Sequence, residues 1–412
     1  MEQFRVDEIL KTCHNLAKTD YEKIEEIAMF NQKKVLDAFR KNRITYMHFN
    51  PSNGYGYDDI AREKLNKLYS DVLGAEASIV SPLIANGTHA LTLGFFGLLR
   101  PNDTLVSISG KPYDTLDEVI NGEGNGSLKD FNINYKQIEL LDNGDFDVAK
   151  IDVMLTEIKP KLVFMQRSKG YAWRDAVSVY DIGKMIAHIK EISPKTLVMV
   201  DNCYGEFVED KEPTEFGADL IVGSLIKNIG GGLAPTGGYL SGKQACIDQV
   251  AYRLTAPSLG LEVGSYAASY QPFYQGLFLA PSTVKNAMKG NILAGYVFKL
   301  LNYDTMPKVG TIPKDTIRSI KFDTAEELIA FCQKIQTVSP IDSYVTPEPW
   351  DMPGYGHQVI MAAGTFVQGA SLELTADGTV RDPYVAYLQG GLTYEHCKIA
   401  LMEYLLDLNI NI

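Results

Sequence analysis

The sequence predicts an α/β fold, with a mostly parallel sheet covered by helices on both faces and a smaller C-terminal α+β domain. Short apolar runs rich in Val, Ile and Leu alternate with helical stretches between residues 77 and 224, as is typical of strands buried on both faces. After Pro281 the pattern changes to a long apolar-periodic helix followed by mixed elements. A chain of 412 residues, 45% of them hydrophobic, can build two cores of this kind.

Each element follows from its local pattern. Residues 8–43 carry apolar side chains at helical spacing among Lys and Glu, which indicates amphipathic helices, and a Gly- and Tyr-rich loop covers residues 50–57. The expected strands of the main sheet are Ala77–Ser81, Thr104–Ile108, Leu162–Gln166, Leu197–Asp201 and Leu220–Ser224. In the C-terminal region we expect a helix at Val284–Leu301, strands at Ser319–Phe322 and Ser371–Leu374, and a helix at Tyr394–Leu408. The predicted parts are residues 1–58, a large domain of 59–280 and a small domain of 281–412.

Composition argues against several classes of protein. The 39 basic and 51 acidic residues give a net charge of −12, which disfavours general binding to nucleic acid or to anionic membranes. No signal-like start and no run of about 18 apolar residues occurs, so we expect a cytoplasmic protein. Five widely spaced cysteines and six scattered histidines show no disulfide, zinc or other metal pattern.

Two strand ends carry opposite charges that suit one ligand. Asp201 ends one predicted strand, and Lys227 lies three residues after Ser224, which ends the next. The carboxyl ends of such strands meet at the crevice where open α/β sheets bind ligands. Pyridoxal 5′-phosphate (PLP) needs this pair, because an amine forms its Schiff base and a carboxylate keeps its ring nitrogen protonated. A single lysine in a glycine loop is usually only solvated, so the prediction depends on the joint spacing.

A glycine turn upstream supplies a second part of the same site. Asn86-Gly87-Thr88 leads into a predicted helix, whose free amides and positive dipole end would hold a phosphate dianion. A helix cap by Asn or Thr is the alternative for this turn. Tyr113 is placed to stack on the cofactor ring, although most buried aromatic side chains belong to a core.

These motifs resemble a known family. Asp201-Asn-x-Tyr, Gly217-Ala-Asp-Leu, Ser224-x-x-Lys227 and Leu99-Arg-Pro-x-Asp103 are similar to the cysteine/methionine-metabolism PLP enzymes, which include methionine γ-lyase and the cystathionine lyases. That resemblance covers about residues 75–245. Three further motifs resemble the bacterial methionine γ-lyase-like or "aluminium resistance" branch over nearly the whole chain: Gly54-Tyr-Gly-Tyr57-Asp58, Gln166-Arg-Ser-Lys-Gly-Tyr171 and Gln389-Gly-Gly-Leu-Thr-Tyr-Glu-His396.

The resemblance implies the aspartate-aminotransferase-like fold of PLP-dependent transferases (fold type I) and a role for each matched residue. Lys227 matches the Schiff-base lysine and Asp201 the partner of the pyridine nitrogen. The other matches are Tyr113 as the stacking tyrosine, Gly87 and Thr88 as the phosphate-binding turn, and Ser224 as the phosphate-binding serine.

Two family elements are altered in this chain. A Tyr-x-Arg pair from a neighbouring subunit usually grips the phosphate, but here the loop reads Tyr55-Gly56-Tyr57, so Tyr57 would serve without the arginine. This implies an inter-subunit loop within residues 1–58 and a homodimer or homotetramer. The Pro-x-Asn-Pro turn beside the cofactor 3′-oxygen is replaced around Ser168, which we take as its substitute.

The substrate carboxylate calls for an arginine, whose planar fork grips both oxygens. Our candidate is Arg381, with Arg167 as the second choice. A surface arginine paired with Asp377 or Asp382 is the alternative for Arg381.

The resulting hypothesis is a carbon–sulfur lyase that acts on a sulfur-containing amino acid of the methionine, cystathionine or cysteine type. Lys227 would remove the α-proton, with help from Tyr113, and elimination at Cβ or Cγ would give a 2-oxo acid, ammonia and a thiol. An aminotransferase or a racemase would use the same residues, and a non-catalytic binding protein with this fold is the alternative from another class.

Overall fold

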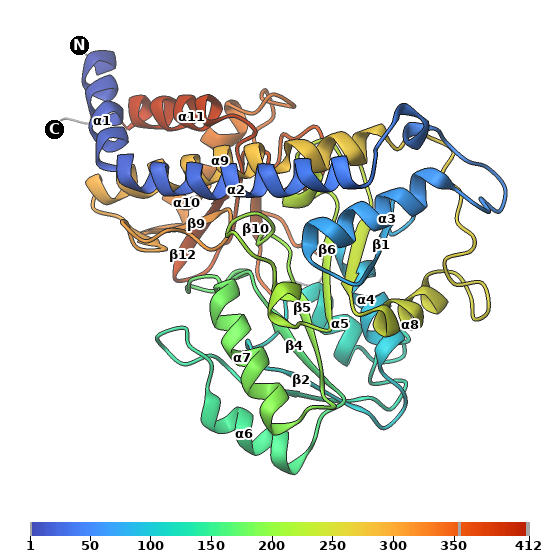
Figure 1. The fold of residues 1–412 in the computed structure, drawn as a ribbon. Coiled ribbons are helices and arrows are strands. Elements are labelled where there is room, and N and C mark those ends of the chain that lie inside the picture. The colour runs from blue at the N-terminus through green and yellow to red at the C-terminus, as the bar shows by residue number, and fades with distance from the viewer. Residues whose placement is uncertain (1, 353–355, 409–412) are drawn as a thin grey trace.

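The computed structural model describes residues 2–352 and 356–408. Figure 1 shows its elements in chain order. The helices are α1 (Glu2–Leu16), α2 (Lys18–Lys41), α3 (Ile60–Leu73), α4 (Gly87–Leu98), α5 (Asp114–Asn121), α6 (Val148–Glu157), α7 (Val179–Ile192), α8 (Gln244–Leu254), α9 (Gln271–Leu300), α10 (Ala325–Thr337) and α11 (Tyr394–Asp407), with short 3-10 helices at Tyr46–Phe49, Pro213–Phe216 and Asn228–Gly230. The strands are β1 (Ala77–Ser81), β2 (Thr104–Ser107), β3 (Asn134–Gln137), β4 (Leu162–Gln166), β5 (Leu197–Asp201), β6 (Leu220–Ser224), β7 (Gly238–Gly242), β8 (Asp304–Met306), β9 (Ile317–Phe322), β10 (Val359–Ala362), β11 (Thr375–Thr379) and β12 (Tyr384–Gln389).

The main sheet has the mostly parallel arrangement that the sequence predicts. Its seven strands lie in the order β1-β7-β6-β5-β4-β2-β3. Strand β7 is antiparallel to both neighbours, whereas the other paired strands run parallel. All five predicted strands of this sheet are present, with only the end of β2 differing by a residue.

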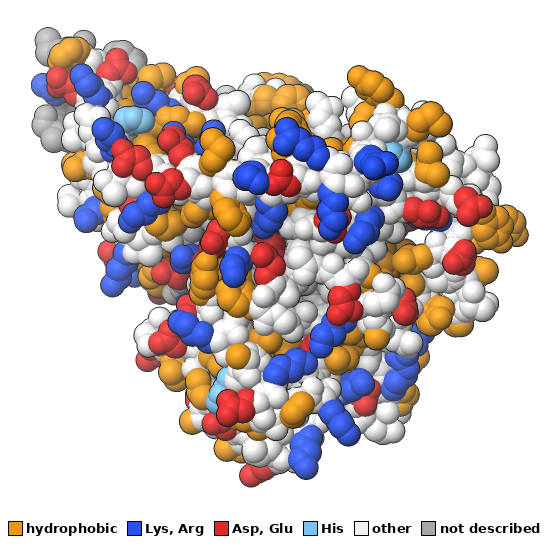
Figure 2. Space-filling view, viewed as in Figure 1, with side chains coloured by type: hydrophobic (Ala, Val, Ile, Leu, Met, Phe, Trp, Pro, Cys, Tyr) orange, Lys and Arg blue, Asp and Glu red, His pale blue; other side chains and the backbone are white. Residues whose placement is uncertain are grey.

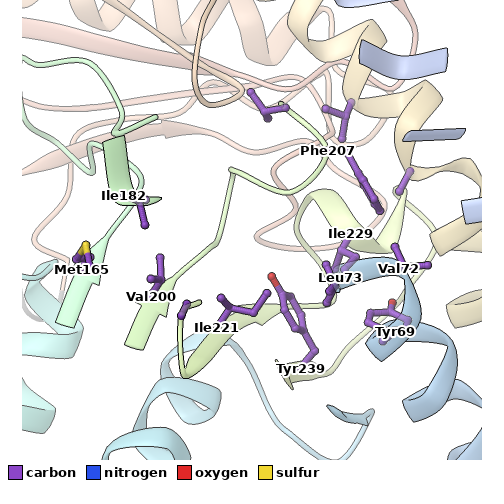
Figure 3. Packing of buried hydrophobic residues seen from close by; sticks show 14 of the residues in the cluster. Tyr69, Val72, Leu73, Met165, Ile182, Val200, Phe207, Ile221, Ile229 and Tyr239 are labelled. Atoms are coloured by element: carbon purple, nitrogen blue, oxygen red, sulfur yellow. The ribbon is translucent and has the colours of Figure 1, made fainter. Parts of the chain in front are cut away.

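The main sheet is buried on both faces because alternate residues of each strand point to opposite sides. In β5, Val198 and Val200 belong to a core cluster with residues of α2, α3, α7 and α9. Met199 points the other way, into a cluster with α4, α5 and α8. Figure 3 shows part of the first cluster, where Tyr239 and Ile221 of the sheet lie near Tyr69 of α3. Continuous apolar runs are therefore what this sheet requires.

The smaller C-terminal sheet is antiparallel, with strand order β10-β11-β12-β9-β8. One face packs on α10, α11, α1 and the end of α9. The predicted strand Ser371–Leu374 is wrong, because β11 begins only at Thr375. Here polar side chains hold the backbone outside the sheet: Ser371 Oγ donates to Asn228 Oδ1 at 2.9 Å, and the Glu373 carboxylate accepts from two loop amides at 2.7 and 2.8 Å.

Helix α9 joins the two sheets without a break. It runs from Gln271 to Leu300 and contains Pro281, so the helix expected from Val284 begins earlier and the predicted boundary at 280/281 falls inside it. Helix α2 packs along α9, whereas α1 joins the C-terminal core through Val6, Leu10 and Cys13. The three predicted domain ranges stay a prediction.

The surface carries mixed charge. On the face shown in Figure 2, basic and acidic side chains are interspersed. Within residues 2–352 and 356–408, no helix is both long and apolar enough to cross a bilayer. The five cysteines are buried and free of disulfides.

Candidate functional site

A cavity of about 890 Å³ lies between the carboxyl ends of the central strands and the C-terminal sheet. Gln166, Asp201 and Val222 are in register on β4, β5 and β6, so the residues that follow these strands meet at one edge. Eight of the predicted site residues line this cavity: Gly87, Thr88, Tyr113, Ser168, Asp201, Ser224, Lys227 and Arg381.

Lys227 is half-buried at the start of the short helix that follows β6. Its Nζ donates to the Tyr204 hydroxyl at 2.9 Å and to the Gly369 carbonyl at 2.6 Å, and it lies 4.7 Å from the centre of the Tyr204 ring. Burial alone would lower the pKa of Lys227, but Tyr204, Cys203 and Asp377 outweigh it and hold the pKa above its ordinary value. The amine is thus held in place by two oxygen atoms and charged in this arrangement.

Asp201 ends β5 and is only 4% exposed. Its Oδ1 accepts from the Cys203 amide at 3.1 Å. Burial raises the pKa of Asp201 to about 6, although the hydrogen bonds from Cys203 and the charge of Lys227 oppose this rise. A protonated ring nitrogen beside this carboxylate would offset its desolvation and stabilise its charged form.

The start of α4 forms a cup against the end of β6. Asn86 caps the helix by accepting from the His89 amide at 2.8 Å. A Cβ added at Gly87 would lie in ordinary contact with Ser224 Cβ at 3.4 Å and Cys203 Sγ at 3.7 Å, so the glycine leaves that space free. The first amides of a helix have no partner within it, and Ser224 Oγ makes only a long contact of 3.4 Å to the Gly237 carbonyl. These donors suit an anion.

Tyr113 and Ser168 lie on the cavity wall beside β4. The Tyr113 hydroxyl shares a hydrogen bond of 2.9 Å with Thr88 Oγ1, and its amide donates to Gln166 Oε1 at 3.1 Å. The carbonyl of Ser168 accepts from Gln166 Nε2 at 3.3 Å and from Arg174 at 2.9 Å, and its side chain is buried at the cavity edge. The Tyr113 hydroxyl is therefore held against the start of α4, in the cavity that Asp201 also lines.

Arg167 is placed differently from the prediction. Gln166 and Ser168 line the cavity, so the residue between them points away. Its guanidinium is fully buried and contacts the Glu209 carboxylate at 2.6 Å, Asn202 Oδ1 at 2.9 Å and the Gly205 carbonyl at 2.8 Å. The assignment of Arg167 to the substrate carboxylate is therefore wrong for this structure, because its donors are used inside the core.

Arg381 is exposed at the end of β11 and lines the cavity. Among residues 2–352 and 356–408, Arg381 forms no ion pair with either Asp377 or Asp382. Its guanidinium is therefore available to bind a ligand carboxylate. Tyr57 is 58% exposed, stacks on Tyr55 with 5.4 Å between ring centres, and does not line this cavity. Its contribution to a neighbouring subunit stays a prediction.

Sequence reasoning missed three cavity residues that surround Lys227. Tyr204 has a positive φ of 70°, which is uncommon for a residue other than glycine, and its ring centre lies 4.7 Å from Lys227 Nζ. Asp377 and Tyr171 come from β11 and from the loop after β4, and Tyr171 donates a hydrogen bond to the Asp377 carboxylate. Alternating polar residues in Thr375-Ala-Asp377-Gly-Thr379 were the available signal for Asp377.

Comparisons of the sequence with known proteins find relatives over nearly the whole chain. Residues 6–409 match the model of the methionine gamma-lyase family. The uncharacterized protein YnbB of Bacillus subtilis (strain 168) is 50% identical over 384 residues, which cover 92% of this chain and 91% of YnbB.

Solved structures are similar over nearly the whole chain as well. The crystal structure of a carbon-sulfur lyase involved in aluminum resistance from Clostridium novyi NT is 48% identical, with a TM-score of 0.94 over 98% of this chain and 96% of that one. The pyridoxal-5′-phosphate dependent protein YhfS from Escherichia coli, at 15% identity, shares the fold with a TM-score of 0.62 over 94% of this chain and 97% of YhfS. The chain has the PLP-dependent transferase fold and belongs to the methionine gamma-lyase family.

Proposed function

We propose that the protein is a PLP-dependent carbon–sulfur lyase that acts by β- or γ-elimination on a sulfur-containing amino acid. The observation that carries this proposal is the position of the Lys227 amine, which lines the same cavity as Asp201 and the start of α4. Family membership and the carbon-sulfur lyase of Clostridium novyi NT support the reaction class.

The cavity residues fit PLP in charge and in shape. The open space at Gly87, with the α4 amides and Ser224 Oγ around it, matches a phosphate dianion. The buried Asp201 carboxylate matches a protonated ring nitrogen, and Tyr113 matches the face of a flat ring. Lys227 would hold the cofactor covalently through Nζ. When bound, PLP supplies an electron sink for the substrate α-carbon.

Side chains of this protein would carry out proton transfer and substrate binding. Lys227 Nζ would accept the α-proton of the substrate, and the Tyr204 hydroxyl, 2.9 Å away, would keep the amine oriented. Arg381 would bind the α-carboxylate through its fork. The net reaction breaks one carbon–sulfur bond and consumes one water, and it yields a 2-oxo acid, ammonia and a thiol.

Purified protein reconstituted with PLP tests the proposal directly. With cystathionine, methionine and cysteine as substrates, we expect a 2-oxo acid and a thiol in equal amounts from at least one of them. An aminotransferase or a racemase would release neither thiol nor ammonia, and a non-catalytic binding protein would convert none of the three.

Lys227→Ala should abolish both turnover and the visible band near roughly 420 nm of the lysine-bound cofactor. Lys111→Ala is the matched control, because Lys111 also lines the cavity but pairs with Asp117 at 3.0 Å. It should keep the band and the activity. Full turnover by Lys227→Ala would contradict the proposal.

A further inference from the structure

The loop between β10 and β11 supplies one of the two oxygen atoms that hold Lys227. Lys227 Nζ donates to the Gly369 carbonyl at 2.6 Å, although the two residues are 142 positions apart in the chain. Gly369 has a φ of 79°, and a Cβ there would lie 3.3 Å from Ile226 Cδ1, so the turn at this position favours glycine. Gly369 and Ala370 both line the cavity. The C-terminal part of the chain therefore reaches the amine through a backbone carbonyl.

The side chain of Glu373 fixes the segment that precedes this turn. Glu373 is 3% exposed, and its carboxylate accepts from the Phe366 amide at 2.7 Å and from the Val367 amide at 2.8 Å. The Ala370 amide then donates to the Val367 carbonyl at 3.1 Å, which closes the turn. A buried carboxylate is costly unless it is well hydrogen-bonded. Both of its oxygens are used here to hold the backbone that leads to the Gly369 carbonyl.

Two contacts fix the end of the same loop. Ser371 Oγ donates to Asn228 Oδ1 at 2.9 Å, and Asn228 directly follows Lys227 in the chain. A Cβ at Gly390 would lie 2.0 Å from the Glu373 carbonyl oxygen, so the backbone at Glu373 packs closely on the end of β12. With both ends held, the position of the turn depends on the hydrogen bonds that the Glu373 side chain accepts.

We infer that Glu373 is a positioning residue, which holds this loop so that the Gly369 carbonyl binds the Lys227 amine whenever that amine is free. The catalytic part of this inference rests on the proposed lyase function. When Lys227 Nζ takes up the substrate α-proton, it becomes an ammonium group with three donors. The Gly369 carbonyl and the Tyr204 hydroxyl are in place to accept two of them. A fixed acceptor stabilises the charged amine and keeps Nζ directed into the cavity.

Other groups around Lys227 also act on its charge. Tyr204 and Cys203, on the turn after β5, and Asp377, on β11, raise the pKa of Lys227, whereas burial lowers it. Asp201 at the end of β5 interacts with the same amine electrostatically. All four groups stay in place when the loop is loosened. Loss of the carbonyl acceptor alone should therefore lower the pKa of Lys227.

Competitive labelling of the cofactor-free, full-length protein provides the test. Acetic anhydride reacts with the neutral amine, and mass spectrometry of the peptide that contains Lys227 gives its labelling rate against pH. Glu373→Ala should lower the apparent pKa of Lys227 by roughly one unit, and so raise its labelling rate roughly tenfold at a pH below that pKa, as expected for one lost hydrogen bond to a charged group. Circular dichroism verifies the fold.

Glu373→Gln separates position from charge. It removes the same charge as Glu373→Ala but keeps one oxygen that can accept from a loop amide, so its labelling rate should lie between those of the wild type and Glu373→Ala. If Glu373→Ala does not fold, an increased rate in Glu373→Gln supports the inference and an unchanged rate overturns it. Equal shifts in two folded variants would assign the effect to charge and would also overturn it.

Asp130→Ala is the matched control. The Asp130 carboxylate also accepts from two loop amides, of Gly124 at 3.1 Å and Gly126 at 2.8 Å, but it does not line the cavity. This variant should leave the labelling of Lys227 unchanged, and a change equal to that in Glu373→Ala would contradict the inference. In the reconstituted enzyme, Glu373→Ala should lower kcat more than it raises KM. A wild-type protein that releases no thiol would refute the lyase function, whereas the labelling of the cofactor-free protein reads out the loop contact independently.

Discussion

Replacing Arg167 with Met separates a structural role of this arginine from substrate binding. Arg167 lies at the centre of a buried ionic cluster, with Glu209 at 2.6 Å and Glu212 at 3.8 Å. It also fixes the turn after β5 through Asn202 and Gly205. Met fills a similar volume, but it removes the ion pair of Glu212 and leaves Glu209 with only the partly exposed Lys314 at 3.3 Å. Breaking a buried pair by removing one partner costs about 3–5 kcal/mol, and we expect the free energy of unfolding to fall by that amount.

Urea unfolding followed by circular dichroism measures this loss. The double variant Arg167→Met/Glu209→Gln should recover part of the stability, because one of the two carboxylates that lose Arg167 becomes neutral. Steady-state kinetics on the folded Arg167→Met protein should show a KM close to that of the wild type, since Arg167 does not line the cavity. Unchanged stability together with a KM raised tenfold would refute this reasoning and restore the role in substrate binding.

Two further predictions concern a buried acid and the subunit interface. Burial raises the pKa of Glu206 from 4.5 to about 8, so the folded protein holds a proton that the unfolded chain releases, and stability should fall as pH rises through this window. Glu206→Gln should flatten that slope in unfolding experiments, and an unchanged slope would count against the assignment. Tyr57→Ala should lower activity at a neighbouring subunit's site; mixing it with Lys227→Ala subunits should restore activity in hybrids that contain one intact site. An active monomer, by light scattering, would disprove the shared site.

The main sheet could be predicted because each of the predicted strands is a continuous apolar run in the sequence. Leu197–Asp201 matches β5 residue for residue, since a strand buried on both faces must be apolar throughout. Strand β7 was missed, because Gly-Tyr-Leu-Ser-Gly is short and ends in glycine. A Cβ at Gly242 would lie 2.2 Å from the Asp219 carbonyl, so its glycine serves close packing with β6. Only the neighbouring strand reveals that requirement.

The residues of the cofactor side could also be predicted from local sequence, because Asp201 ends β5 and Lys227 follows the adjacent parallel strand β6. The residues of the substrate side could not be predicted from local sequence in the same way. Strand alternation already separates Arg167 from Gln166 and Ser168, and applying it would have corrected that assignment from the sequence. The same alternation places Asp377 on one face of β11, but which face meets the cavity is decided by packing of the opposite face on α10 and α11. The cavity wall opposite the main sheet therefore depends on the docking of two sheets, which no local motif records. If this wall contacts the substrate, as we propose for Arg381, variants of the C-terminal sheet should change substrate choice while leaving the cofactor band intact.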